Sequence, residues 1–124
     1  MRVFLSCLTA LLVLSAGAQT DSAVKFKTTT HSFGKIKQHV PASTEFTLTN
    51  NSDKALIIET ATAECGCTTP DYPKSPIAKG KSATIKVTYN AESPGKFTKR
   101  VTVKFANIKE PTVLTIDGDV EEKL

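Results

Sequence analysis

The amino-acid sequence predicts an all-β protein, an antiparallel two-sheet β-sandwich of about seven strands. Apolar and polar residues alternate in short runs, and turn residues divide these runs at intervals of about 8–12 residues, as in such sandwiches. No longer run places apolar side chains at helical spacing. The length of 124 residues fits one small domain. We therefore expect residues 19–124 to fold as a single sandwich domain.

Residues 1–18 are expected to be a cleavable signal peptide. Arg2 gives a positive start, Val3–Ser15 is apolar, and Ala16–Ala18 supplies the small residues that are typical of a cleavage site. The apolar run is shorter than the roughly 20 residues that a membrane-spanning helix needs. The sequence therefore predicts an exported protein, periplasmic or extracellular, with no membrane insertion after cleavage.

In most of the expected strands apolar and polar residues alternate, as in a half-buried antiparallel strand. In chain order these runs are Ala23–Thr28, Thr30–Ile36, Thr44–Asn50, Ala55–Ala61, Ser82–Asn90, Phe97–Phe105 and Thr112–Val120. Their apolar side chains are expected to point inward and form the core: Val24, Phe26, Phe33, Ile36, Phe46, Leu48, Leu56, Ile58, Ile85, Val87, Tyr89, Phe97, Val101, Val103, Phe105, Leu114, Ile116 and Val120.

Turn residues separate these strands. Val40–Ser43, Asn50–Asp53 and Ser93–Gly95 combine Pro, Gly, Asn, Asp and Ser, which set turn dihedrals or bond to the nearby backbone. Two glycines lie inside runs rather than between them. We expect a bend or a β-bulge at Gly34, and a β-bulge at Gly118 within an Asp-Gly-Asp triplet that lacks the other ligands of a calcium loop.

The longest connection, Cys65–Gly80, holds Pro70, Pro73 and Pro76. Because proline has no backbone N–H, this density of prolines excludes a helix or a central strand there. We expect a stiff loop. Its first part is a candidate partner-contact loop, formed by Thr68, Thr69, Asp71 and Tyr72.

The charge is mildly basic and scattered. Removing residues 1–18 takes Lys and Arg from 16 to 15, which against 12 acidic residues leaves +3. The lysines lie singly along the strands, as on a solvated face, and do not form the basic patch of a nucleic-acid-binding protein. The partner we expect is an envelope or extracellular protein rather than a nucleic acid.

Two of the three cysteines, Cys65 and Cys67, remain after removal of the signal peptide. In an extended strand their α-carbons would be near the upper limit of disulfide reach, and Gly66 could supply unusual backbone angles that shorten the gap. Against a reactive thiolate, Glu64 is adjacent, and the nearest cation in the sequence is Lys74.

Three interpretations of this pair stay open. The two cysteines could be structural, as a disulfide or as packed thiols. They could be a redox pair that exchanges disulfides with a partner. They could also bind a soft metal, copper(I), and then His31 or His39 would be the imidazole ligands that the sequence offers.

No combination of nucleophile, base and orienting acid appears, so we expect no catalytic residue, no enzyme and, copper aside, no cofactor. Two modification patterns are present. Asn50-Asn51-Ser52 fits an N-glycosylation acceptor, and Asp21-Ser22-Ala23 resembles a bacterial O-glycosylation acceptor at Ser22.

An ordered set of short motifs resembles the secreted bacterial domain-of-unknown-function family 1573. The set runs through His31–Ile36, Phe46–Asn50, Cys65–Thr68, Pro76-Ile77, Gly80-Lys81, Ile85–Tyr89 and Gly95–Phe97. The resemblance implies an immunoglobulin-like sandwich akin to the major-sperm-protein-like domains, exported, with no established activity. The chain has no Trp and no two mature cysteines far apart, so it lacks the inter-sheet disulfide of antibody domains.

The function we expect is that of a non-enzymatic exported module that binds another protein or contributes to envelope assembly. Sandwiches offer loops and strand edges for this purpose, and strand addition is a common way to recognise an extended chain. The alternative is a thiol redox or copper-binding protein that uses Cys65 and Cys67.

Overall fold

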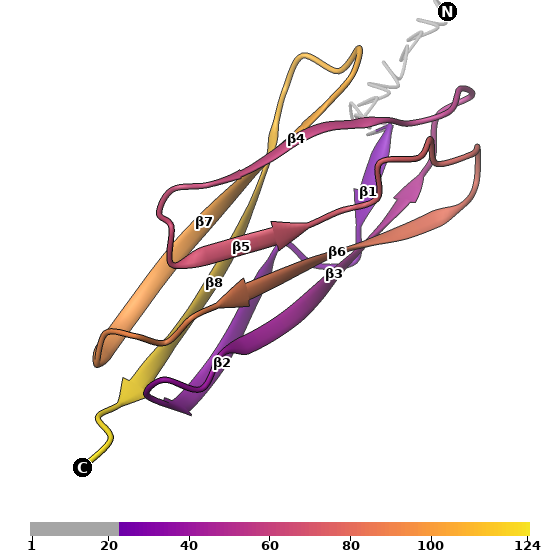
Figure 1. Cartoon of the computed structure of the whole chain (residues 1–124). Helices are drawn as coiled ribbons and strands as arrows, with labels where there is room; N and C mark the ends of the chain where they lie inside the picture. Colours follow the sequence, from indigo (N-terminus) through magenta and orange to yellow (C-terminus); the bar gives the residue numbers. More distant parts are fainter. Residues whose placement is uncertain (1–22) are drawn as a thin grey trace, which may run out of the picture.

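The computed structural model describes residues 23–124, which form two four-stranded sheets packed face to face (Figure 1). The expected signal peptide and Ser22 lie outside the described residues. Within residues 23–124, no helix is long and apolar enough to span a membrane. The all-β prediction is confirmed.

The first sheet has the strand order β1-β3-β6-β5, and the second has the order β2-β8-β7-β4. Their bounds, in the order of each sheet, are β1 (Val24–Phe26), β3 (Ala42–Asn50), β6 (Ser82–Tyr89) and β5 (Thr68–Asp71), then β2 (Thr30–Lys37), β8 (Thr112–Glu121), β7 (Gly95–Phe105) and β4 (Ile58–Ala63). Strands β4 and β5 are consecutive in the chain and lie at the edges of different sheets.

Strand β5 corrects the expectation of a loop over Cys65–Gly80. It pairs antiparallel with β6 in a regular register, with Pro70 opposite Val87. The N–H of Asn90 donates to the carbonyl of Cys67, so these two residues form a hydrogen-bonded pair. Hydrogen-bonded and non-bonded pairs alternate along an antiparallel ladder, which makes Pro70 and Val87 a non-bonded pair. The nitrogen of Pro70 therefore points away from β6. A missing N–H therefore costs no ladder bond at this edge position.

The pairing of β2 with β8 is parallel, which corrects the expectation of a purely antiparallel sandwich. After β1, the chain passes from the first sheet to the second without reversing, and it then runs beside the last strand in the same direction (Figure 1). The other strand pairs are antiparallel.

The core lies between the sheets and is built from the predicted alternation. Phe46, Leu48, Ile85, Val87 and Val103 are fully buried, and most of the other expected inward side chains are buried as well. Three expected anchors, Phe26, Phe33 and Ile36, are only partly buried and pack against the rim of the core.

Two local predictions have different outcomes. Gly34 has a φ of 68°, and the β2–β8 register shifts between Ser32 and Lys35, so the bulge at Gly34 is confirmed. The bulge at Gly118 is wrong, because Gly118 pairs in regular register with Phe97 of β7. Strand β4 also begins later than expected, since Leu56 forms an isolated bridge with Ile77 instead.

Candidate functional site

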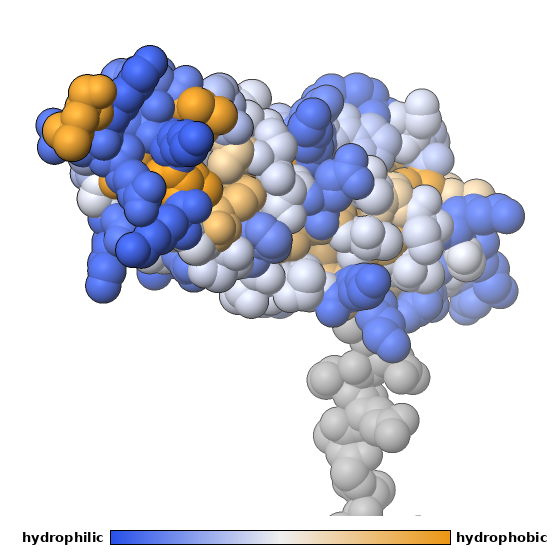
Figure 2. Space-filling view, turned by 90° about the horizontal axis from the view of Figure 1, so that it is seen from below, coloured by the Kyte–Doolittle hydropathy of each residue, from blue (hydrophilic) through white to orange (hydrophobic). Residues whose placement is uncertain are grey.

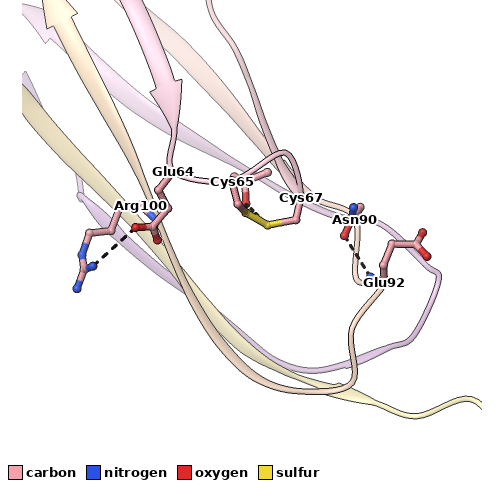
Figure 3. Close-up of a disulfide and its surroundings, with 7 residues drawn as sticks. Glu64, Cys65, Cys67, Asn90, Glu92 and Arg100 are labelled. Carbon is pink, nitrogen blue, oxygen red and sulfur yellow. Dashed lines mark hydrogen bonds and ion pairs between the residues drawn. A yellow bond between two sulfur atoms is a disulfide. The ribbon is translucent and has the colours of Figure 1, made fainter.

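The Cys-Gly-Cys triplet forms a tight turn that carries the chain from β4 in one sheet to β5 in the other (Figure 3). Inside the turn, the N–H of Thr68 donates to the carbonyl of Cys65 at 3.4 Å. The triplet therefore lies at the open side of the sandwich, between two strand edges.

Cys65 and Cys67 are joined by a disulfide, with their α-carbons 5.3 Å apart. This separation is inside the usual range of about 4.4–6.8 Å. Gly66 is not among the glycines with a positive φ, and a Cβ built on it would meet no atom within 4 Å. The turn therefore does not need the unusual backbone angles that we expected from Gly66.

Backbone hydrogen bonds on both sides hold the turn independently of the disulfide. The N–H of Asn90 donates to the carbonyl of Cys67 at 2.9 Å, and the N–H of Glu64 donates to the carbonyl of Arg100 at 3.2 Å. The disulfide itself closes a loop of only three residues, for which the chain-entropy model gives about 1–2 kcal/mol of stabilisation. The disulfide therefore adds little stability to a turn that backbone hydrogen bonds already hold in place.

The hydroxyl of Thr68 is the polar group next to the two sulfurs. Its Oγ1 lies 3.8 Å from Sγ of Cys65 and 3.6 Å from Sγ of Cys67. Thr68 is 4% exposed. It is therefore a buried neighbour of the disulfide and not the surface contact residue that we predicted.

The other predicted contact residues divide in two. Thr69 and Asp71 are exposed on β5, whereas Tyr72 is half-buried against the core. The Nζ of Lys74 lies 3.3 Å from the centre of the Tyr72 ring. Lys74, the nearest cation to the cysteines in the sequence, is therefore engaged with Tyr72.

Glu64 does not face the sulfurs either. Its Oε1 accepts the N–H of Arg100 at 3.0 Å, and its Oε2 lies 4.0 Å from Nη1 of the same residue (Figure 3). The guanidinium offsets the carboxylate charge. Although Glu64 is adjacent to Cys65 in the sequence, its carboxylate is therefore directed at Arg100 and not at the disulfide.

The two histidines are engaged elsewhere. His31 packs edge-on against Phe33 with ring centres 4.8 Å apart, and Nδ1 of His39 lies 3.0 Å from Oε2 of Glu92. Among residues 23–124, no group of three His, Cys, Asp or Glu side chains is placed to hold a metal ion. The structure does not bring either histidine together with Cys65 and Cys67.

A surface hollow of about 430 Å³ opens beside Cys67. The buried rings of Tyr89 and Phe97, stacked with centres 3.9 Å apart, contribute to its lining. Lys96 and Lys99 also line it. Cys65 is not among the lining residues, so the hollow approaches the disulfide from the side of Cys67.

Three of the four sheet edges carry features that discourage pairing with another chain. Strand β1 has three residues, β2 has the bulge at Gly34 with Lys35 and Lys37, and β5 has four residues including Pro70. Strand β4 contains neither Pro nor Lys; its register with β7 shifts between Ile58 and Thr60, and from Thr60 to Ala63 the pairing is regular. It is the least protected edge of the described domain.

The free backbone groups of β4 belong to two alanines that the sequence analysis did not single out. The N–H of Glu64 donates to the carbonyl of Arg100, and hydrogen-bonded and non-bonded pairs alternate along an antiparallel ladder. Thr60 and Thr62 are therefore hydrogen-bonded to β7. The N–H and C=O groups of Ala61 and Ala63 point away from β7, toward the free edge. Their side chains pack toward the core. The edge therefore offers two free donor and acceptor pairs.

The N-glycosylation pattern is buried. Asn50 is 0% exposed, and its amide nitrogen donates to the carbonyls of Lys54 and Ile77, each at 2.8 Å. Its Oδ1 accepts the N–H and the hydroxyl of Ser52. The side chain closes a turn and is inaccessible in the folded domain.

Comparison with known proteins identifies a family and a fold. Residues 24–120, more than half of the chain, match the model of a family described as "Protein of unknown function (DUF1573)". No curated protein matches the chain.

Three solved structures share the fold. A protein of unknown function from Porphyromonas gingivalis W83 aligns with a TM-score of 0.68 and 11% identity over 78% of this chain and 46% of that one. An ASH/PapD-like domain of human CEP192 gives 0.70 and 8% over 82% and 87%. WR4, an MSP family member of C. elegans, gives 0.53 and 9% over 81% and 99%.

These likenesses confirm the immunoglobulin-type, major-sperm-protein-like sandwich. At such low identity they show the fold alone. The chain spans less than half of the Porphyromonas protein.

Proposed function

The chain belongs to the DUF1573 family of proteins of unknown function, and we propose that it is a non-enzymatic exported module that binds another protein. The mode of binding is strand addition, in which an extended segment of the partner pairs with the free edge of β4. The observation that carries this proposal is the pair of outward-facing backbone positions at Ala61 and Ala63, on an edge with neither Pro nor Lys.

Strand addition fits the backbone of β4 and the surroundings of its free edge. Main-chain hydrogen bonds give affinity in this mode, and alternate side chains of the added strand give specificity. An added strand would place every second side chain toward the open side of the sandwich, next to β5 and the disulfide turn. The partner segment is therefore extended, with apolar residues at alternate positions.

Few large apolar side chains are strongly exposed on the described part of the chain. On the face shown in Figure 2, apolar residues gather mainly near the end at which the chain finishes, and hydrophilic residues interrupt them. Strongly exposed large apolar side chains are few among the described residues: Val40, Ile57, Val113 and Leu124. Exposed Ile57 directly precedes β4 and extends its edge with an apolar side chain.

Export is part of the proposal and has two supports. The first is the expected signal peptide, and the second is the Cys65–Cys67 disulfide, because disulfides persist in oxidising compartments. The partner is then an envelope or extracellular protein.

Photo-crosslinking tests the binding edge. A photoreactive residue is placed at position 62 of β4 or at position 102 of β7, which lies directly opposite on the same face of the sheet. Each protein is irradiated with an envelope extract of the exporting cell. We expect an adduct from position 62 and none from position 102.

A matched pair of charge variants completes this test. With the photoreactive residue kept at position 62, Thr60→Lys puts a lysine on the free edge, whereas Thr102→Lys puts the same charge on a strand that is paired on both sides. The adduct from position 62 should be lost with Thr60→Lys and kept with Thr102→Lys. Equal adducts from both positions, or equal losses in both variants, would refute the edge as the binding site.

A further inference from the structure

We propose that Cys65–Cys67 is a redox-active disulfide that oxidises a dithiol of another protein, with Cys67 as the sulfur attacked and Thr68 as the hydrogen-bond donor to the leaving sulfur. The proposal does not depend on strand addition at β4. It rests on access to one sulfur, on the buried hydroxyl and on a turn that is fixed without the disulfide.

Access is asymmetric. Both cysteines are partly buried, and Cys67 packs against the core, but the hollow of about 430 Å³ is lined by Cys67 and not by Cys65. Attack by a thiolate must come in line with the S–S bond from the side of the sulfur that it joins. The hollow therefore favours attack on Sγ of Cys67 and departure of Sγ of Cys65.

The leaving sulfur meets a donor that is already in place. Oγ1 of Thr68 is 3.8 Å from Sγ of Cys65 and 3.6 Å from Sγ of Cys67. A disulfide sulfur has no proton, so the threonine hydroxyl is the donor. When the bond opens, this hydroxyl can turn to either thiolate, and a hydrogen bond to an ionised acceptor is stronger than one to a neutral acceptor.

The exchange balances in two steps. A partner thiolate attacks Sγ of Cys67, the S–S bond breaks, and Cys65 leaves with the electron pair as a thiolate that takes a proton from solvent. The second thiolate of the partner then attacks the partner's own sulfur in the mixed disulfide and expels Cys67, which is also protonated. The partner dithiol loses two electrons and two protons, and the cysteine pair gains them.

The domain can undergo this exchange without unfolding. Asn90 holds Cys67, and Arg100 holds Glu64, through backbone bonds that do not involve sulfur. Strands β4 and β5 also keep their pairing with β7 and β6. Reduction should therefore free two thiols on a turn that stays where it is.

Charge around the hollow indicates the class of dithiol. Lys96 and Lys99 line it together with one acidic residue, Glu92, whose carboxylate also contacts His39. This excess of positive charge favours a thiolate over a thiol and favours a partner cysteine flanked by acidic side chains.

The test measures reduction of the oxidised full-length chain. Two dithiol peptides of equal length are used, one with acidic and one with lysine residues beside the cysteines, at low ionic strength. We expect the acidic peptide to react several-fold faster with the folded chain. The same disulfide in the urea-unfolded chain should show no such preference.

Mapping and one variant pair complete the test. Glutathione, a monothiol, should give a mixed disulfide on Cys67 when the reaction is quenched with acid. Thr68→Val should slow the reduction several-fold and move the alkylation profile of the reduced pair to higher pH, whereas Thr69→Val on the exposed side of β5 should change neither.

Mapping to Cys65 would overturn the proposal. Equal rates with the two peptides, no faster for the folded chain than for the unfolded chain, would also overturn it. Equal effects of Thr68→Val and Thr69→Val would do the same. The wild-type measurements decide the matter even if Thr68→Val does not fold.

Discussion

The ring of Phe97 lies directly over Gly118, its paired residue on the neighbouring strand. A Cβ added to Gly118 would be 2.8 Å from one ring carbon of Phe97 and 3.0 Å from the carbonyl oxygen of Gly34. Tyr89 stacks on the same ring. Glycine at this position therefore makes room for an aromatic pair that also lines the hollow beside Cys67.

Gly118→Ala should destabilise the fold. The added methyl must displace a ring that is packed on both sides, and overpacking of this kind costs about 1–3 kcal/mol. Urea unfolding measures the change in free energy. Gly66→Ala is the matched control, because its Cβ would meet nothing within 4 Å and its φ is not positive. A loss in Gly66→Ala as large as in Gly118→Ala would contradict the packing argument.

Asn50→Ala should lower the free energy of unfolding by about 1–3 kcal/mol, because it leaves a buried carbonyl without its donor. The carbonyl of Ile77 is the buried one of the two that receive the Asn50 amide. Asn51→Ala, at the exposed neighbouring position, should change stability by less than about 0.5 kcal/mol. Similar losses in the two variants, in the same unfolding experiment, would rule out the buried hydrogen bonds as the cause.

Stability should fall as the pH rises above 10. Burial raises the pKa of Tyr89 above its ordinary value of 10.0, so in that range the unfolded chain loses the phenol proton before the folded chain does. The unfolded state then binds fewer protons, and the free energy of unfolding falls with pH. Tyr89→Phe should flatten this fall in unfolding curves collected between pH 9 and about 11. An unchanged slope would show that other groups cause it.

Replacing both Cys65 and Cys67 by serine should leave the domain folded. The closed loop of three residues contributes about 1–2 kcal/mol in the chain-entropy model, less than longer loops do. Guanidinium unfolding of the double variant, compared with the oxidised protein, measures the difference. A loss beyond about 4 kcal/mol would mean that the disulfide is a major structural support and would weaken the redox proposal.

The sequence alone was enough for the core and for most strands. Residues such as Phe46, Leu48, Val87 and Val103 lie where a two-residue period places them, because each strand buries one face against the other sheet. The bulge at Gly34 also follows from local chemistry, since glycine readily adopts a positive φ.

The features that were predicted wrongly depend on contacts between segments that are distant in the sequence. Whether Pro70 can lie in a strand depends on which side of that strand is paired, and the parallel pairing of β2 with β8 depends on how the chain crosses between sheets. Thr68 was misplaced for the same reason, because the burial of its side chain depends on the packing of β5 and cannot be predicted from sequence spacing. The free edge at Ala61 and Ala63 emerges only from the strand order.

Amide hydrogen exchange along β4 tests the central claim most directly. In the free protein, the amides of Thr60, Thr62 and Glu64 should exchange slowly, and those of Ala61 and Ala63 should exchange fast, because their N–H groups face solvent. In the complex with the partner captured at position 62, the amides of Ala61 and Ala63 should become at least as protected as their neighbours. Unchanged fast exchange at both alanines in the complex would contradict binding by strand addition at this edge.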